Sequence, residues 1–259
     1  ILFGERLDLQ AGIKKEGTRL VSFRSERGLV VKAKIFIDAT YEGDLLAKAG
    51  VSYHVGREAN SVHAETLNGF QPQHAIYHQF DKPVDPFVIP GKPESGLLWG
   101  ILPEPKPVPA DGTGDRKIQA YNFRVCLTDA SENRIAIDKP EGYDAAHYEL
   151  LLRSLQAGLT KKLFAHGQMP NRKTDTNNNG PFSTDLIGGN YDYPEGTYAT
   201  REKILKEHRR YQQGLLWFLA NDPRVPEAVR YDVGRWGLCR DKFTDNGGWP
   251  LQVYIREWR

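Results

Sequence analysis

The sequence predicts an α+β fold for this chain of 259 residues. Segments with strand character dominate its first half and segments with helical periodicity dominate its second half, whereas an α/β protein would alternate the two. The clearest strand signal is the alternation of apolar and polar residues over 119–128. The clearest helix signal is the spacing of apolar residues over 200–220. With 39% hydrophobic and 26% charged residues, the composition is typical of a soluble globular protein.

The N-terminal segment has the pattern of a β-meander followed by a strand–turn–helix unit. Strands are predicted at 19–23 and 29–37, with a turn at Arg27–Gly28 between them. The run from Ile35 to Ile37 is continuously apolar, as in a strand that is buried on both faces. Short side chains follow, then Gly43, which lets the chain turn, and then a short helix. This geometry can present backbone to a phosphate-bearing cofactor.

A plainer interpretation of the same loop is that Asp44 caps the short helix and Gly50 ends it. A capping carboxylate does not rule out a nearby ligand, so both interpretations stay open. Two carboxylates facing a phosphate would be unfavourable, so Glu42 is expected to point toward a ribose, water or a basic partner. Arg57 is the candidate for that partner or for the phosphate itself.

The middle of the chain is rich in proline. Nine of the sixteen prolines fall between Pro72 and Pro109, a spacing that forbids long helices and central strands. An extended, loop-rich region is therefore predicted over 72–109, with one buried strand at 97–102. The next segment, 119–128, is predicted to be a strand with one apolar face, Tyr121, Phe123, Val125 and Leu127, and one polar face, Asn122, Arg124, Cys126 and Thr128.

Two helices are predicted in the second half of the chain. One spans 143–164, although Gly158 weakens its far end. The other spans 200–220, with a basic face opposite its apolar stripe, and the sequence Asn221–Asp222–Pro223 stops it.

The segment 173–185 contains alternating polar side chains. Asp175, Asn177 and Asn179 precede Gly180 as in a calcium-binding EF-hand loop, but the twelfth position is Leu186, where a bidentate Glu is needed. The sequence therefore predicts no metal site here. An Asn-rich turn whose side chains bond its own backbone is the plain alternative to a binding segment.

Charge, cysteine and histidine patterns limit the function classes. Thirty-five basic and 33 acidic residues give a formal charge of +2, and no basic block indicates nucleic acid binding. Cys126 and Cys239 are too few for a disulfide scaffold or a thiolate zinc site, and they are predicted to be isolated buried thiols. The seven histidines show no metal spacing, and His54 or His78 is a candidate proton donor. No apolar run approaches the ~20 residues that span a bilayer, which leaves the compartment open, secretion included.

One block carries a family resemblance. Residues 37–50 have the sequence IDATYEGDLLAKAG and residues 55–58 have the sequence VGRE. Together they resemble the second cofactor-contacting motif of the FAD-dependent oxidoreductases, within the glutathione reductase-type flavoproteins, although Ala39–Thr40–Tyr41 stands where relatives often have Ala-Thr-Gly. Further similar segments lie at 119–128, 171–190 and 241–259. The last of these includes a Tyr-x-Arg-Glu-x-Arg pattern that begins at Tyr254.

The resemblance implies FAD as cofactor and a fold in which part of a flavin-binding domain, a β-meander with its closing strand, joins a mixed sheet-and-helix substrate domain. The expected boundaries are 1–58 and 59–259. The Gly-x-Gly-x-x-Gly turn that holds the ADP pyrophosphate in such proteins does not occur in this sequence. We therefore expect an internal piece of a longer flavoprotein, one that by itself holds FAD weakly and is inactive.

The resemblance also implies site residues. Cofactor contact is expected for Asp38, Ala39, Thr40, Glu42, Gly43, Asp44, Gly56 and Arg57. Catalytic roles are expected for Asn122, Arg124, Lys173 and Asp175, and substrate contact for Asn177, Asn178, Tyr254 and Arg256. A guanidinium beside an amide could fix a carboxylate or polyol, or stabilise anionic reduced flavin. The plain alternative for Arg124 is an ordinary salt bridge on a solvated strand face.

The expected activity is hydride transfer between FAD and a small-molecule, carbohydrate-like substrate, with no nucleic acid partner and an open oligomeric state. Members of the family are sometimes labelled xanthan lyase, so a polysaccharide lyase or a carbohydrate-binding module is the alternative. The five tryptophans could stack on sugars, but so many in this length are more often core anchors.

Overall fold

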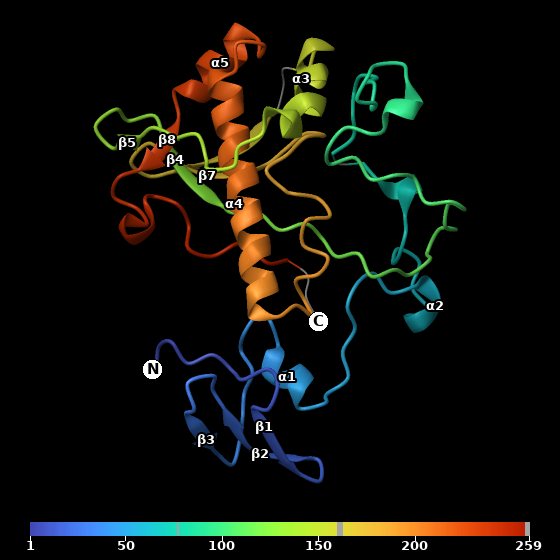
Figure 1. Cartoon of the computed structure of the whole chain (residues 1–259), viewed down its shortest axis with the longest axis vertical. Coiled ribbons are helices and arrows are strands. Elements are labelled where there is room, and N and C mark those ends of the chain that lie inside the picture. The colour runs from blue at the N-terminus through green and yellow to red at the C-terminus, as the bar shows by residue number, and fades with distance from the viewer. Residues whose placement is uncertain (77, 160–162, 257–259) are drawn as a thin grey trace.

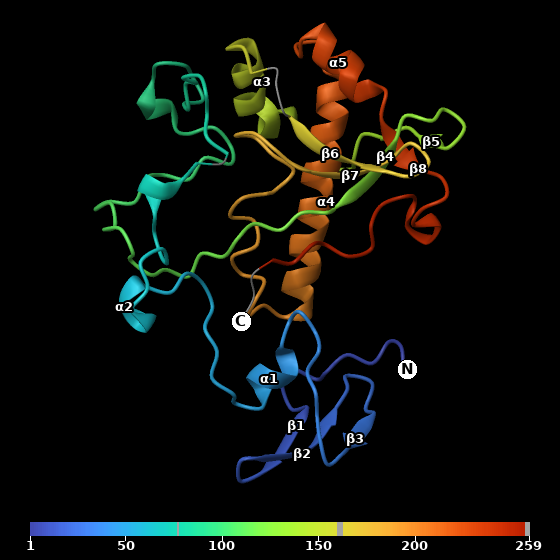
Figure 2. The same ribbon diagram turned by 180° about the vertical axis from the view of Figure 1, so that it is seen from behind.

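The structure, a computed structural model, describes residues 1–76, 78–159 and 163–256. Two antiparallel sheets and one long helix organise the chain (Figure 1). The small sheet, near the N-terminus, lies at one end of the molecule, and the larger sheet crosses the long helix near the other end (Figure 2). This combination of helices and antiparallel sheets confirms the predicted α+β class.

The small sheet is a three-stranded meander. It comprises β1 (Ile13–Glu16), β2 (Arg19–Arg24) and β3 (Val30–Lys32), paired in the order β1-β2-β3. Gly17 allows the tight turn between the first two strands because its φ of 59° lies in the left-handed region. The predicted strand at 19–23 is therefore confirmed, and the short helix α1 (Asp44–Lys48) follows the meander as expected.

The second predicted strand is only partly correct. β3 ends at Lys32, and the apolar run beyond it is exposed, with Ile35 at 77% and Ile37 at 81% exposure. A strand needs a neighbouring backbone, and in the described part of the chain no strand pairs with this run. The prediction of a strand buried on both faces is therefore wrong for these residues in this structure.

The proline-rich region forms the loops predicted for it. It follows the one-turn helix α2 (Asn60–His63) and contains two 3₁₀ turns, Pro72–His74 and Pro93–Ser95. The buried strand predicted at 97–102 is wrong, because only Leu97 makes a strand-like bridge, to Phe87. Left-handed glycines on both sides of the bridge, Gly96 (φ 84°) and Gly100 (φ 82°), turn the chain away from an extended path.

The larger sheet has five antiparallel strands in the order β5-β8-β4-β7-β6. In chain order they are β4 (Val125–Thr128), β5 (Arg134–Ile135), β6 (Phe164–Met169), β7 (Lys173–Asn178) and β8 (Gly237–Cys239). Pairing on both sides satisfies the backbone of β7. The alternative of an Asn-rich turn is therefore wrong for the strand residues. Its local bonds do occur at the end of β7, where the Asn178 N–H donates to Asn177 Oδ1 and the Gly180 N–H donates to Asn179 Oδ1.

Three helices accompany this sheet: α3 (Glu149–Gln156), α4 (Tyr198–Asn221) and α5 (Glu227–Gly234). α4 matches the predicted helix at 200–220, and Thr197 caps it by accepting a hydrogen bond from the Thr200 N–H. The helix predicted at 143–164 is shorter, because a 3₁₀ turn (Ala145–Tyr148) precedes α3 and Gly158, at a φ of 103°, follows its end. Residues 160–162 lie outside the described residues.

The core lies between α4 and the larger sheet. The apolar face predicted for 119–128 is buried there: Tyr121, Phe123, Val125 and Leu127 are each at most 4% exposed. Gln212 of α4 fixes the register by bonding both backbone groups of Phe123, donating to its carbonyl at 2.8 Å and accepting from its N–H at 3.1 Å. The polar face of the same strand therefore points away from α4. A second apolar cluster joins α3, α4 and α5.

Candidate functional site

The loop between β3 and α1 is organised by its own side chains. The Asp38 carboxylate accepts hydrogen bonds from the Thr40 N–H (3.1 Å), the Thr40 hydroxyl (2.7 Å) and the Leu46 N–H (3.1 Å). The Thr40 hydroxyl in turn accepts from the Gly43 N–H at 3.0 Å, and Gly43 is in the left-handed region with a φ of 57°. Burial alone would raise the pKa of Asp38, but these bonds outweigh it and lower the pKa. Asp38 therefore stays charged and fixes the conformation of the loop through these hydrogen bonds.

Asp44 joins this loop to the long helix. Its two carboxylate oxygens accept from Arg201 of α4 at 2.6 and 2.8 Å, and both side chains are buried. Arg201 also donates to the carbonyl oxygens of Tyr193 and Pro194. The N-cap of α1 is Gly43, and Asp44 lies in the first turn, so the plain interpretation that Asp44 is the capping residue is wrong, whereas Gly50, at a φ of 79°, follows the end of the helix as expected.

Gly56 and Arg57 hold a different contact. The Arg57 guanidinium forms a two-pronged pair with Asp115, with Nε to Oδ1 at 2.9 Å. Gly56 has a φ of 103° and lies against the backbone of residues 115 and 116, where a Cβ would meet the Asp115 carbonyl oxygen at 2.2 Å. Both residues thus pack the end of the N-terminal segment against residues 115 and 116, which precede β4 in the chain.

A pocket of about 540 Å³ lies between the loop and α4. We call it the loop pocket. Its wall contains four of the expected cofactor residues, Asp38, Ala39, Thr40 and Glu42, together with Asp44 at its edge. Apolar and aromatic side chains line another part of it, among them Phe23, Ile37, Leu45, Tyr193 and Tyr198. Four further charged side chains, Glu5, Arg6, Arg201 and Glu202, complete the lining. The loop pocket therefore combines loop atoms and charged groups with an apolar and aromatic wall.

The polar face of the larger sheet brings the expected catalytic residues together. Arg124 and Asp175 form a two-pronged ion pair across β4 and β7, with Nε to Oδ1 at 2.9 Å. Lys173 lies two residues before Asp175 on the same face, and its ammonium donates to Asp241 at 2.5 Å. That bond raises the pKa of Lys173. The plain alternative of a salt bridge for Arg124 is what the structure contains, but on a half-buried face rather than a solvated one.

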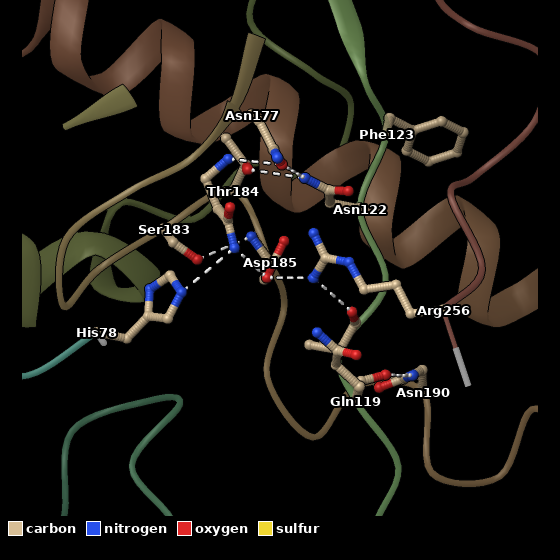
Figure 3. A network of polar contacts seen from close by, with 12 residues as sticks. His78, Gln119, Asn122, Phe123, Asn177, Ser183, Thr184, Asp185, Asn190 and Arg256 are labelled. Atoms are coloured by element: carbon tan, nitrogen blue, oxygen red, sulfur yellow. Dashed lines mark hydrogen bonds and ion pairs between the residues drawn. The ribbon is translucent and has the colours of Figure 1, made fainter. Parts of the chain in front are cut away.

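Asn122 continues this face toward the interior. It is fully buried, and its amide donates to Asn177 Oδ1 at 2.8 Å and to the Thr184 hydroxyl at 3.2 Å (Figure 3). Among the described residues its own Oδ1 has no hydrogen-bond donor. Its backbone carbonyl accepts from the Tyr254 N–H at 2.7 Å. The Tyr254 ring lies 5.6 Å from the guanidinium carbons of both Arg124 and Arg256.

Asp185 is the centre of a connected polar network (Figure 3). Its Oδ2 accepts from Arg256 at 2.8 Å and from the Asn178 amide at 2.5 Å. Its Oδ1 is buried and, within the described residues, has no hydrogen-bond partner. Burial raises the pKa of this carboxyl, and Arg256 opposes the rise.

His78 reaches the network from the proline-rich region. Its Nδ1 lies 2.7 Å from the Gly180 carbonyl oxygen and its Nε2 lies 3.4 Å from the Asn178 amide. A carbonyl can only accept, so Nδ1 carries the proton and Nε2 the lone pair in the neutral ring. The backbone of His78 has a φ of 57°, which is uncommon for a residue other than glycine.

Sequence reasoning named most of this network but missed its centre. Asp185 carried no signal of its own, because an acidic residue in a loop is ordinarily a surface residue. His78 was one of two candidate proton donors, and His54 is exposed and makes no contact with the network in the described residues. Of the Tyr-x-Arg-Glu-x-Arg pattern the structure describes Tyr254 and Arg256, which both contact this site, while residues 257–259 lie outside the described residues.

A second cleft, of about 340 Å³, connects the two groups of residues. We call it the tyrosine cleft. Tyr41 of the loop, Arg124 of the sheet face and Tyr254 line it together, with Phe243. The expected cofactor loop and the expected catalytic face therefore share one concave surface, although they are far apart in the sequence.

A model of the FAD dependent oxidoreductase family matches residues 1–259, which is the whole chain. The chain belongs to the FAD-dependent oxidoreductase family. The family implies FAD as the cofactor, so the resemblance carried by residues 37–58 is confirmed at this level. No curated protein and no solved structure matches the chain. Among the described residues, no helix of this oxidoreductase is long and apolar enough to cross a membrane.

The loop pocket fits one part of FAD better than another. Its volume is in the range of cofactor sites, and its apolar and aromatic wall suits a flat ring system. In contrast, the N–H groups of Thr40, Gly43 and Leu46 already donate to side chains within the loop. These three groups are not directed at a diphosphate, so the lining of the loop pocket suits the ring and its attached chain rather than the diphosphate.

Proposed function

We propose that this FAD-dependent oxidoreductase oxidises a polar, hydroxylated small molecule that binds in the tyrosine cleft. The observation that carries the proposal is that Tyr41, from the loop beside the loop pocket, lines the same cleft as Arg124 and Tyr254. The loop 38–45 thereby lies between a site suited to the flavin and a cleft that combines apolar side chains with the polar groups of Tyr41, Arg124, Gln252 and Tyr254. A cofactor on one side of this loop and a substrate on the other would meet at its exposed tip.

The sheet face supplies the groups that would bind such a substrate. Two nitrogens of Arg124 are bound to Asp175, while Nη1 makes no hydrogen bond with the described residues. The side chains of Arg124 and Asp175 are 36% and 39% exposed, so a ligand can reach both. A guanidinium N–H beside a carboxylate offers a donor and an acceptor, which matches a hydroxyl-bearing molecule better than an apolar one.

Oxidation of an alcohol to a carbonyl removes a hydride from carbon and a proton from oxygen. FAD, when bound, supplies the hydride acceptor. The acceptor that we assign to the proton is the Asp175 carboxylate, because it is bound to Arg124, which lines the cleft. His78 does not line the cleft, and its Nε2 already accepts from the Asn178 amide.

The alternative of a lyase or carbohydrate-binding module gains no support from the tryptophans. Trp249 is 1% exposed, Trp217 packs on Tyr143, and Trp236 stacks on His166. Trp99 is 38% exposed but stacks on His147 at 4.1 Å between ring centroids, and Trp258 lies outside the described residues. These side chains serve packing in the described structure, so we do not propose that function.

The cofactor part of the proposal is tested by filling the loop pocket. Ala39 lines it, is exposed and makes no side-chain hydrogen bond, so Ala39→Trp should obstruct the pocket without unfolding the loop. We expect the Kd for FAD, measured by flavin fluorescence, to rise at least about tenfold. Ala136→Trp, at another exposed alanine, is the control and should leave the Kd unchanged. Unaltered FAD binding in Ala39→Trp would place the cofactor elsewhere.

The substrate part is tested at Arg124. In the longer flavoprotein that the sequence predicts, anaerobic bleaching of FAD absorbance by a panel of aldoses, uronic acids and polyols identifies a reactive compound. With that compound, Arg124→Met should lower the rate of flavin reduction by about ten- to a thousandfold, the scale of one charged contact to the transition state. Arg124→Lys should recover little, because an ammonium cannot reproduce the fork. An unchanged rate with a lowered melting temperature would make Arg124 purely structural.

A further inference from the structure

The two cysteines, which are 113 positions apart in the sequence, are in contact. Their Sγ atoms lie 3.6 Å apart, and the Cys239 thiol also lies 3.6 Å from the Cys126 carbonyl oxygen. The sequence prediction of isolated thiols is therefore wrong. The cause is the strand order, because β8 pairs with β4 in the register Leu127–Leu238 and Thr128–Gly237. One further step along the two antiparallel strands places Cys126 opposite Cys239.

This placement meets the geometric requirement for a disulfide. Residues directly opposite on antiparallel strands have Cα atoms about 4.5–5.5 Å apart, within the range of about 4.4–6.8 Å that a disulfide needs. Closing the bond requires the sulfurs to approach by roughly 1.5 Å, to the usual S–S length of about 2.05 Å. Side-chain rotation can supply a displacement of this size without changing the strand pairing.

The two thiols have unequal surroundings. Cys239 is fully buried, and burial raises its pKa to about 12, whereas Cys126 is partly exposed. The Lys173 ammonium on the neighbouring strand is close enough to interact electrostatically with both sulfurs. Of the two thiols, Cys126 is the one that solvent can reach, so it is the sulfur that an oxidant meets first.

A metal site is the other chemistry that paired cysteines could serve. Structural zinc requires four ligands, and a catalytic zinc site three. Over residues 1–76, 78–159 and 163–256, no group of three or more His, Cys, Asp or Glu side chains is arranged to hold a metal ion. The neighbours of the pair include Lys173, which repels a cation. Thiol chemistry is therefore the use that the surroundings favour.

We propose that Cys126 and Cys239 form a reversible cross-strand disulfide when the protein meets a peroxide. The Cys126 thiolate attacks one oxygen of hydrogen peroxide and breaks the O–O bond, which leaves a sulfenic acid and a hydroxide that takes up the thiol proton as water. The Cys239 sulfur then attacks the Cys126 sulfur and displaces the second oxygen as water with its own proton. Two thiols and one peroxide thus give one disulfide and two waters, and a dithiol reductant reverses the oxidation.

The experiment treats the full chain with hydrogen peroxide and counts thiols after denaturation. The chain has only two cysteines, so we expect the count to fall from two to none, with a mass loss of two hydrogen atoms and no covalent dimer. Because the bond would close a long loop, the melting temperature should rise by about 5–15 °C and return to its original value after reduction.

Single variants separate this bond from other oxidation. Cys239→Ser should leave Cys126 as a sulfenic acid or its further oxidation products, with no rise in melting temperature, and Cys126→Ser should leave Cys239 unreacted because it is buried. Two free thiols after treatment, added oxygen on the parent protein, or a disulfide between two chains would each overturn the proposal. The thiol count and the mass do not depend on FAD or substrate, so they test this inference separately from the proposed function.

Discussion

His208 shows how the environment of one side chain changes its chemistry. It lies on α4, is only 2% exposed, and its Nδ1 donates to the Ile204 carbonyl at 2.8 Å. Within the described residues its Nε2 has no hydrogen-bond partner. Burial lowers the pKa of this ring, with the bond to Ile204 acting weakly in the opposite direction. The folded protein therefore keeps His208 neutral where an unfolded chain would protonate it.

This difference predicts a loss of stability in mild acid. As the pH falls below about 6.5, the ordinary pKa of histidine, the unfolded chain binds a proton at His208 that the folded chain does not, so the free energy of unfolding decreases. His208→Asn retains a donor for the Ile204 carbonyl and cannot titrate. We expect a lower melting temperature at pH 7.5 but a smaller decline toward pH 5.5 than in the parent.

The control for this measurement is His63→Gln, at a histidine whose side chain is 59% exposed. Its pH profile should follow that of the parent. Burial also lowers the pKa of His147 and His166, so part of the decline will remain in His208→Asn. The pKa of Asp185 is raised in the folded state, so above about pH 3.8 this carboxyl adds stability as the pH falls, which opposes the effect of the histidines. A profile of His208→Asn that parallels the parent would mean that His208 titrates normally in the folded state.

At the scale of elements, α4 and the strand segment before β4 act as one unit. Gln212 supplies both a donor and an acceptor to the backbone of Phe123, at a position where no neighbouring strand pairs with that residue among the described strands. This contact lets the strand face remain buried beyond the end of the sheet ladder. It also fixes which side of the chain carries Asn122 and Arg124, and so which side becomes the candidate site.

The matching prediction compares two neighbouring glutamines. Gln212→Leu leaves two buried backbone groups of Phe123 without partners, so the free energy of unfolding should fall by about 2–5 kcal/mol. Gln213→Leu removes only an exposed bond to the Asp138 carbonyl and should cost less than about 1 kcal/mol. Urea denaturation of both variants gives the comparison. Equally small losses of stability in both variants would show that water can replace Gln212 as the hydrogen-bond partner of the Phe123 backbone.

At the scale of the whole molecule, the N-terminal unit is attached to the rest through the first turns of α4 (Figures 1 and 2). The buried pair between Asp44 and Arg201 is central to this attachment. Tyr198 adds a hydrogen bond to the Leu7 carbonyl at 3.0 Å, and Arg6 pairs with Glu202 at 3.0 Å in an exposed position. The domain boundary expected at residue 58 stays a prediction, because these contacts cross it and the loop pocket has walls from both sides.

Arg201 and Glu202 are adjacent in α4, but loss of their ion pairs is expected to have very different effects. Asp44→Leu leaves the Arg201 charge buried without its carboxylate and should lower the free energy of unfolding by about 3–5 kcal/mol. Glu202→Gln breaks an exposed pair and should cost at most about 1 kcal/mol. Adding Arg201→Met to Asp44→Leu should recover part of the loss, because no unpaired charge then remains. Additive losses in the double variant would show that the two side chains act independently.

The sequence by itself determined the features that depend on neighbours along the chain. The periodicity over 200–220 predicted α4, and the proline spacing predicted the loops of 72–109. The alternation over 119–128 predicted the buried and polar faces of that segment. The block at 37–58 identified the family. Each of these signals is carried by residues within a few positions of one another, where backbone dihedral preferences and side-chain spacing act directly.

Only the tertiary structure decided which distant residues meet. The strand order β5-β8-β4-β7-β6 brings Cys126 to Cys239 and Arg124 to Asp175, and the loop from the proline-rich region brings His78 to the Asp185 network. The exposure of Ile35 and Ile37 has the same origin, because a strand-forming sequence becomes a strand only when another backbone pairs with it. Local propensity limits what each segment can form, whereas burial and hydrogen bonding between segments select the partners.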